Sequence, residues 1–138
     1  MKIMVSACLL GKNCKYNGGN NLNQKVLDFI QGHEVIPVCP EVSGGLPTPR
    51  VPSEILNGIV TNKEGHNVDH EFRTGAKIEF EKATKEKVDL VILQSRSPSC
   101  GPKQIYDGTF SKKLVDGQGI FAKLLMEHGF QIIDVEDL

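Results

Sequence analysis

The chain has 138 residues, a length at which one domain, residues 1–138, can bury a hydrophobic core without disulfide bonds. Hydrophobic residues make up 39% of the chain and charged residues 24%, as is ordinary for a globular protein, and the net charge is −1. No basic block stands out and no run approaches the roughly 20 apolar residues of a membrane span, so we expect no binding to duplex nucleic acid and no membrane segment.

Four short apolar runs predict buried strands, and each is nearly continuous in Val, Ile and Leu, as is typical of parallel strands covered on both faces. Helical patterns lie between them. The longest helix is predicted to be capped by Asp69 and to have a solvated charged face that includes Glu79. In chain order we expect strand Lys2–Cys8, helix Leu22–Gln31, strand Glu34–Cys39, helix Asp69–Lys87, strand Val88–Gln94, helix Gly119–His128 and strand Phe130–Val135.

This alternation predicts an α/β fold: a single three-layer, Rossmann-like domain with a four-stranded, mainly parallel sheet. The segment from Ile55 to Asn67 is predicted to form a small hairpin or excursion. Long loops at the carboxyl edge of the sheet are predicted over Gly11–Asn21, Pro40–Pro52 and Ser95–Gly117. Loops of this length are usually functional or disordered, and their Tyr, Pro, Arg and Cys residues favour function.

Three of the four cysteines follow predicted strands. Cys8 ends the first strand, Cys39 ends the second, and Cys100 lies just after the third. Ligands of open parallel sheets bind beyond the carboxyl ends of the strands, so we expect these thiols at one edge of the sheet. Cys14 is interpreted as a spare thiol. The apolar start of the chain is too short for a signal peptide, so we expect a cytoplasmic protein whose reduced cysteines serve metal or thiol chemistry.

The spacing of the cysteines leaves the kind of metal open. Structural zinc sites usually contain close cysteine pairs, and this chain has none, although four scattered cysteines can still bind zinc. Three thiolates also suit a cubane iron–sulfur cluster in which one iron has no protein ligand. An open metal position is typical of a catalytic site.

Polar residues accompany the cysteines. Glu41 lies two residues after the second cysteine, and Arg50 ends a stiff segment rich in Gly and Pro, where it is either a ligand-binding side chain or a surface arginine. Ser97 and Ser99 lead into the third cysteine and offer hydroxyl groups or ordinary turn chemistry. Tyr106 precedes an Asp-Gly turn, a weak signal on its own.

These residues fall into three motifs. The first is SACLLG at residues 6–11, followed by YNG at residues 16–18. The second runs from PVCPE at residues 37–41 to GGLPTPR at residues 44–50, and the third comprises SPSCG at residues 97–101 and IYDGTF at residues 105–110. In these motifs and their order, over essentially the whole chain, the sequence resembles the thiouracil desulfidase family.

The resemblance implies a [4Fe–4S] cluster on Cys8, Cys39 and Cys100, with the fourth iron free to take the sulfur of a thiolated nucleobase such as 2-thiouracil. It also implies that Glu41 is the catalytic carboxylate. The residues that we further expect to act on the substrate are Ser97 or Ser99 in catalysis and Arg50 and Tyr106 in binding. The expected reaction is a non-redox exchange of sulfur for oxygen, giving the oxygenated base and hydrogen sulfide.

Two other functions are considered. A zinc or iron–sulfur site that only stabilises the fold, with Cys14 as a fourth ligand, would make the protein a small-molecule binding protein without catalysis. A metal-free nucleotide-binding domain is the second, and it has little support because neither G-x-G-x-x-G after the first strand nor a P-loop is present.

Overall fold

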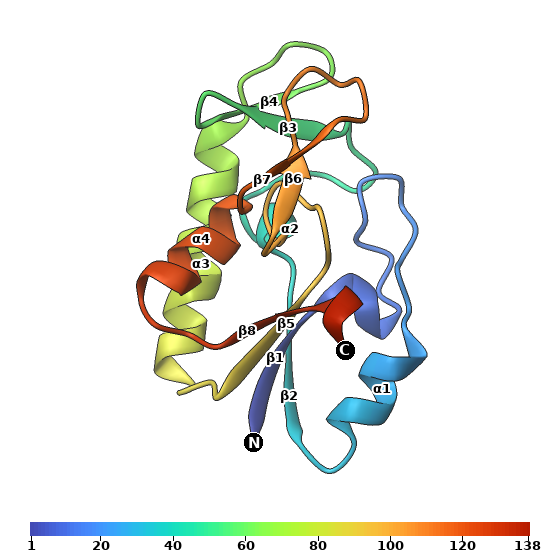
Figure 1. Ribbon diagram of the computed structural model, residues 1–138, viewed down its shortest axis with the longest axis vertical. Helices are drawn as coiled ribbons and strands as arrows, with labels where there is room; N and C mark the ends of the chain where they lie inside the picture. The colour runs from blue at the N-terminus through green and yellow to red at the C-terminus, as the bar shows by residue number, and fades with distance from the viewer.

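The computed structural model describes residues 1–138, which form a central sheet with helices on both faces (Figure 1). The sheet is parallel and has the strand order β2-β1-β5-β8. Its strands are β1 (Lys2–Ser6), β2 (Glu34–Val38), β5 (Leu90–Leu93) and β8 (Ile132–Asp134). The predicted α/β class with a four-stranded parallel sheet is therefore confirmed.

The central strands bury side chains on both faces, because successive residues of a strand point in opposite directions. On β1, Ile3 and Val5 belong to one buried cluster, whereas Met4 belongs to the cluster on the other face. The first face is covered by α1 (Gln24–Ile30) and the second by α3 (Asp69–Lys85) and α4 (Ile120–Glu127). None of the helices combines the length and the apolar character needed to cross a membrane.

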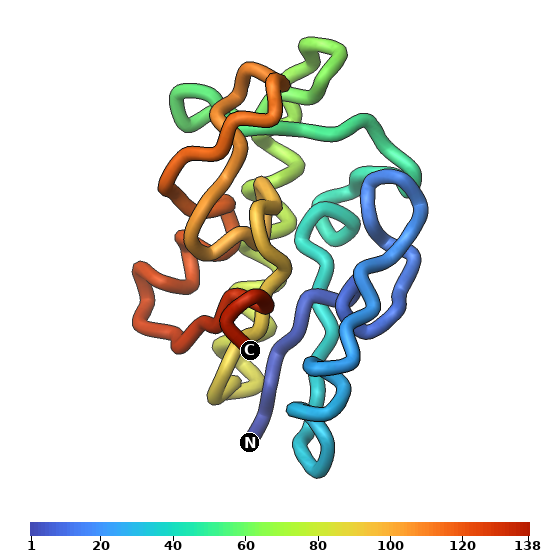
Figure 2. Tube along the Cα trace, turned by 45° about the vertical axis from the view of Figure 1, so that its right-hand side comes forward, coloured from blue at the N-terminus to red at the C-terminus, as the bar shows by residue number.

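Two antiparallel hairpins lie beyond the carboxyl ends of the strands and contact each other (Figure 2). The first consists of β3 (Ser53–Leu56) and β4 (Ile59–Asn62), so the predicted hairpin exists but begins before Ile55. The second consists of β6 (Gln104–Tyr106) and β7 (Leu114–Asp116), inside a segment predicted to be loop. That prediction is wrong because these strands have three residues each and the residues of β7 are exposed, so no buried pattern marks them.

The first two strands end earlier than predicted. After β1 the chain enters a 3₁₀ turn, η1 (Ala7–Leu10), which contains Cys8. After β2, Cys39 directly precedes a short helix, α2 (Pro40–Ser43), in a segment predicted to be loop. Proline is favoured at the first position of a helix, which explains why the chain turns here. A further 3₁₀ turn, η2 (Val135–Asp137), ends the chain.

Helices α2 and α3 are in close contact through glycines. A Cβ atom at Gly75 of α3 would overlap the carbonyl oxygen of Pro40, and one at Gly44 would overlap the carbonyl oxygen of Glu71. Only glycine allows two backbones to approach so closely. The contact fixes α2 against α3, and with it the residues at the start of α2.

Two predictions about α3 are wrong. Glu79 is 2% exposed rather than solvated, because it lies one turn after Gly75 on the face that packs against the protein, where it pairs with Lys82 at 3.2 Å. Asp69 is the first residue of the helix rather than its cap. Its carboxylate accepts a hydrogen bond from the N–H of Val60 in β4 at 3.1 Å and pairs with Arg73 at 2.7 Å.

Candidate active site

A cavity of about 470 Å³ lies at the carboxyl edge of the sheet. Every residue that the sequence analysis proposed for the site lines it. These residues are Cys8, Cys39, Glu41, Arg50, Ser97, Ser99, Cys100 and Tyr106. The structure thus brings all of them together where parallel sheets bind ligands, and their individual roles stay predictions.

All four cysteines are free thiols, and all four line the cavity. Cys100 is buried and the other three are half-buried. Cys14, interpreted from the sequence as a spare thiol, lies beside Cys39, whose Sγ is 3.9 Å from the carbonyl oxygen of Cys14. No group of three or more His, Cys, Asp or Glu side chains is arranged to hold a single metal ion.

The environments of the thiols differ. Burial raises the pKa of Cys100, and it raises that of Cys8 although Asn21 donates a hydrogen bond to the Cys8 sulfur at 3.5 Å. A hydrogen bond with the thiol of Cys14 lowers the pKa of Cys39 to about 7 against the effect of burial, and raises that of Cys14. Cys39 is therefore the thiol that ionises most readily.

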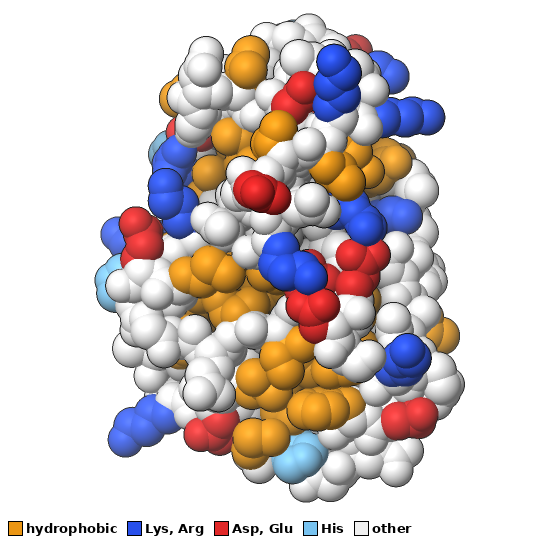
Figure 3. Space-filling view, in the orientation of Figure 1, with side chains coloured by type: hydrophobic (Ala, Val, Ile, Leu, Met, Phe, Trp, Pro, Cys, Tyr) orange, Lys and Arg blue, Asp and Glu red, His pale blue; other side chains and the backbone are white.

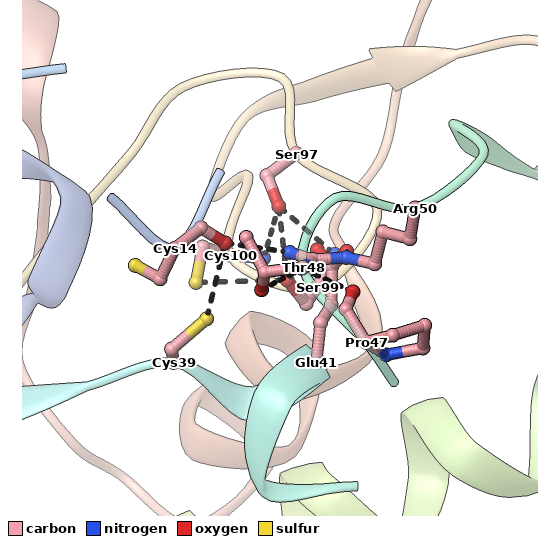
Figure 4. A network of polar contacts seen from close by, with 9 residues as sticks. All are labelled: Cys14, Cys39, Glu41, Pro47, Thr48, Arg50, Ser97, Ser99 and Cys100. Carbon is pink, nitrogen blue, oxygen red and sulfur yellow. Dashed lines mark hydrogen bonds and ion pairs between the residues drawn. The ribbon is translucent and has the colours of Figure 1, made fainter. Parts of the chain in front are cut away.

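Glu41 lies in α2 with both carboxylate oxygens engaged (Figure 4). Its Oε1 accepts a hydrogen bond from Nε of Arg50 at 3.0 Å, and its Oε2 accepts one from the Ser99 hydroxyl at 2.7 Å. The side chains of Glu41 and Arg50 are only 14% and 7% exposed. Charge-assisted hydrogen bonds at both oxygens hold the carboxylate in one orientation.

Arg50 connects three segments around the cavity. Besides Glu41, it donates from Nη1 to the carbonyl oxygen of Pro47 at 3.2 Å and to the hydroxyl of Thr48 at 3.0 Å. Its Nη2 donates to the carbonyl oxygen of Cys14 at 2.9 Å. Arg50 is therefore a buried structural centre of the site and not a surface arginine.

The two serines have different surroundings. The Ser97 hydroxyl oxygen accepts hydrogen bonds from the N–H groups of Ser99 at 3.1 Å and Cys100 at 3.0 Å, so it stabilises the turn. The Ser99 hydroxyl contacts Glu41, lies 3.0 Å from the Ser97 hydroxyl, and belongs to a residue that is 2% exposed. Ser99, rather than Ser97, is thus in direct contact with the carboxylate.

Helix α4 supports this serine turn from behind. The first N–H group of the helix, that of Ile120, donates to the carbonyl oxygen of Pro98 at 2.9 Å. The next two, those of Phe121 and Ala122, donate to the carbonyl oxygen of Ser99 at 2.9 and 3.1 Å. A Cβ atom at Gly119 would lie 2.5 Å from the Ser99 carbonyl carbon, so the chain passes very close to the turn. The start of α4 therefore fixes the backbone that presents the Ser99 hydroxyl.

The sequence analysis missed several residues that line the cavity. Asn21, Glu54 and Lys112 carry polar groups there, and Phe110 adds an aromatic ring. Only Phe110 had a signal in the sequence, since it ends the IYDGTF segment. The others lie in loops or hairpins whose positions no apolar pattern reveals.

The fold and the site place the chain in the class of α/β proteins that bind a ligand at the carboxyl edge of a parallel sheet, in this case in a cavity rich in thiols. Within that class, residues 3–137 match the family described as 2-thiouracil desulfurase, and the chain belongs to this family. The family that the sequence motifs resemble is thereby confirmed.

Two relatives span nearly the whole chain. The uncharacterized protein YbbK of Bacillus subtilis (strain 168) is 35% identical over 146 residues, an alignment that covers 99% of this chain and 97% of that protein. The solved structure of TudS, a [4Fe-4S]-dependent thiouracil desulfidase, is 37% identical and has a TM-score of 0.93. That match covers 99% of this chain and 92% of the TudS chain. This chain is thus homologous to an enzyme along almost its full length.

Proposed function

We propose that the protein is an iron–sulfur-dependent desulfidase that replaces the sulfur of a thiolated nucleobase, such as 2-thiouracil, by oxygen and releases hydrogen sulfide. Its family and its similarity to a thiouracil desulfidase over 99% of the chain support this proposal. The observation that carries it is the convergence of Cys8, Cys39 and Cys100 with the Glu41 carboxylate in one cavity.

The three thiols fit the proposed cofactor. Thiolates are the usual protein ligands of iron–sulfur clusters, and Cys8, Cys39 and Cys100 face one cavity from three separate segments. When bound by three thiolates, such a cluster supplies an iron with an open position, a Lewis acid for the thiocarbonyl sulfur.

Glu41 acts as the general base in this proposal. Its Oε2 takes a proton from water as the water oxygen bonds to the thiocarbonyl carbon, and returns this proton to sulfur as the carbon–sulfur bond breaks. The second proton of the water then passes from the new hydroxyl group to the released hydrosulfide, which completes the carbonyl group and hydrogen sulfide. The products are the oxygenated base and hydrogen sulfide, with no electron transferred. Arg50 keeps the carboxylate oriented through its 3.0 Å contact with Oε1.

Ser99 and Tyr106 orient the substrate in this proposal. The Ser99 hydroxyl, held by Glu41 and close to Ser97, is preorganised to exchange a hydrogen bond with the ring. Tyr106 lines the cavity from the second hairpin. Arg50 contributes indirectly, because its guanidinium is already occupied by Glu41 and by carbonyl oxygens.

We expect the protein to bind a small thiolated base and not duplex nucleic acid. The face seen in Figure 3 carries acidic and basic side chains close together. Exposed side chains of opposite charge also form the ion pairs Arg96–Glu136 and Lys103–Asp137. This face offers no continuous basic stripe for a phosphate backbone. We further propose that the protein works in the cytoplasm, where its free thiols stay reduced.

The proposal is tested with anaerobically reconstituted wild-type protein and two cysteine variants of the same cavity. We expect Cys39→Ala to lose bound iron, the brown cluster absorbance and sulfide release from 2-thiouracil together. We expect Cys14→Ser to keep the iron, because three thiolates suffice. Sulfide release by iron-free Cys39→Ala would overturn the mechanism, and loss of iron from Cys14→Ser as complete as from Cys39→Ala would indicate a closed four-cysteine structural site.

A further inference from the structure

The turn between β6 and β7 is attached to the first hairpin by one carboxylate that the mechanism does not use. Oε1 of Glu54, in β3, accepts hydrogen bonds from the N–H groups of both Gly108 and Phe110, each at 3.0 Å. Two backbone donors from the same turn thus converge on one oxygen of another hairpin. Because Glu54 lines the cavity, this attachment is at the cavity wall.

The turn packs tightly onto β3. Gly108 has a φ of 94°, and a Cβ atom there would lie 2.6 Å from the Cβ of Leu56 and 2.8 Å from the carbonyl oxygen of Ile55. Glycine is therefore needed both for the backbone conformation and for the close approach. The turn has a fixed position relative to the first hairpin.

Phe110 is in an unusual conformation for its residue type. Its φ is 57°, in the left-handed region that bulky side chains rarely adopt. Such a conformation persists only where the surroundings hold it, and the hydrogen bond from the Phe110 N–H to Glu54 is one such constraint. Phe110 lies in the wall of the cavity, which Tyr106 of the same hairpin also lines.

We propose that Glu54 is a positioning residue for substrate binding: by holding the 108–110 turn against β3, it presents the Phe110 ring as an aromatic wall for a flat heterocycle. This proposal rests on the proposed desulfidase function and deepens it. Aromatic rings stabilise a contact with another ring beyond the effect of the area that they bury. Glu54 would then govern how tightly the base binds, and Glu41 how fast it reacts.

Substitutions of Glu54 distinguish the contribution of its hydrogen-bond acceptor from the contributions of its size and charge. Glu54→Gln keeps a carbonyl oxygen that can accept both N–H groups, whereas Glu54→Leu has a similar size and no acceptor. Phe110→Asn removes the ring but keeps the N–H group, and Asn tolerates the left-handed conformation. Glu81→Leu, at an exposed position of α3, is the matched control.

The experiment measures steady-state sulfide release from 2-thiouracil by iron-loaded enzyme. We expect Glu54→Leu and Phe110→Asn to raise KM about tenfold, which corresponds to about 1.4 kcal/mol, with kcat and iron content nearly unchanged. Glu54→Gln and Glu81→Leu should keep the wild-type KM. An unchanged KM in Glu54→Leu or Phe110→Asn, or a fall in kcat and iron content without a rise in KM, would overturn the proposal.

Amide hydrogen exchange provides a readout independent of turnover. The N–H groups of Gly108 and Phe110 should exchange much faster in Glu54→Leu than in wild-type protein or Glu54→Gln, and equal rates would refute the attachment. If the wild-type enzyme releases no sulfide, the proposed function fails. The role of Glu54 is then decided by the Kd of 2-thiouracil from equilibrium dialysis, since nothing consumes the ligand: weaker binding to Glu54→Leu supports the role, and equal binding contradicts it.

Discussion

Glu41 is the residue on which the proposed chemistry depends most, because its two oxygens have different partners. Arg50 holds Oε1 and Ser99 donates to Oε2. Glu41→Gln keeps the size of the side chain but removes the base and the ion pair. General bases typically contribute about 10²- to 10⁴-fold, so we expect kcat for sulfide release to fall within that range while iron content stays at the wild-type level.

Glu81→Gln, at an exposed position of α3, is the control for this measurement and should change neither kcat nor iron content. A kcat of Glu41→Gln within twofold of the wild-type value would show that Glu41 is not the base. Loss of iron in Glu41→Gln would instead assign it a role in holding the site together.

The two serines are expected to respond differently to removal of their hydroxyl groups. Ser99→Ala removes the donor to Glu41, but Glu41 lines the cavity, where water can replace that donor, so we expect a lower kcat with little change in the free energy of unfolding. Ser97→Ala leaves the N–H groups of Ser99 and Cys100 without their acceptor and should destabilise the protein by about 1–3 kcal/mol. Urea unfolding and sulfide release measure the two effects, and the same pattern in both variants would contradict this division of roles.

At the level of residues, the sequence predicted which side chains reach the site but not how they contact one another. The cysteines and Glu41 were found because they follow apolar runs that end at one sheet edge. The order of the serines in the network, the contact between Cys14 and Cys39, and the bonds made by Glu54 depend on loop conformations. No periodicity in the sequence records those conformations.

Among the elements, the contact between α2 and α3 determines where Glu41 lies. We expect Gly75→Ala to lower the free energy of unfolding by about 1–3 kcal/mol, as overpacking does, because the new methyl group overlaps the carbonyl oxygen of Pro40. It should also lower the iron bound, since α2 begins directly after Cys39. Denaturant unfolding and iron analysis check this, with the exposed Lys77→Ala as control, and wild-type values for Gly75→Ala would show that α2 is free to move.

The start of α3 gives a prediction about pH. Burial raises the pKa of Asp69, but the hydrogen bonds from Arg73 and Val60 outweigh it, and the pKa lies below its usual value. A lowered pKa stabilises the fold above the carboxyl pKa of the unfolded chain, about 4, and the effect is lost as the pH falls through the folded value. Solvent screens this pair, because the Arg73 side chain is 53% exposed. Asp69→Asn should therefore lower the free energy of unfolding by less than about 1 kcal/mol at pH 7.

Urea unfolding at neutral pH and below about pH 3 measures the difference in the free energy of unfolding between wild-type protein and Asp69→Asn. We expect it to shrink in acid, where the wild-type carboxyl group is protonated. A difference that stays constant across this pH range would mean that Asp69 contributes through packing rather than through its charge.

The accuracy of the element predictions depended on burial. The four sheet strands were predicted because both of their faces are covered, which leaves continuous apolar runs. The β6–β7 hairpin was missed because its short strands carry no buried pattern. Glu79 was misassigned because it lies on the same buried face of α3 as Gly75. The charge of the side chain gives no sign of that burial.

For the whole molecule, the strand order explains how distant cysteines meet. Strands β2, β1 and β5 are neighbours, and Cys39, Cys8 and Cys100 follow these three strands in turn. The parallel sheet therefore brings residues more than 90 positions apart to one edge, and this is why the location of the site could be predicted. The cavity wall made by the two hairpins could not be predicted. The expectation of a single domain stays a prediction, and one cooperative unfolding transition would check it.

Non-redox, iron-dependent desulfuration is tested most directly by the anaerobic stoichiometry of the reaction with 2-thiouracil in the absence of any reductant. We expect iron-loaded protein to release one hydrogen sulfide for each uracil formed, over many turnovers, and to stop when a chelator removes the iron. Equal turnover by iron-free protein, or no turnover by protein with a full complement of iron and sulfide, would contradict the proposed function.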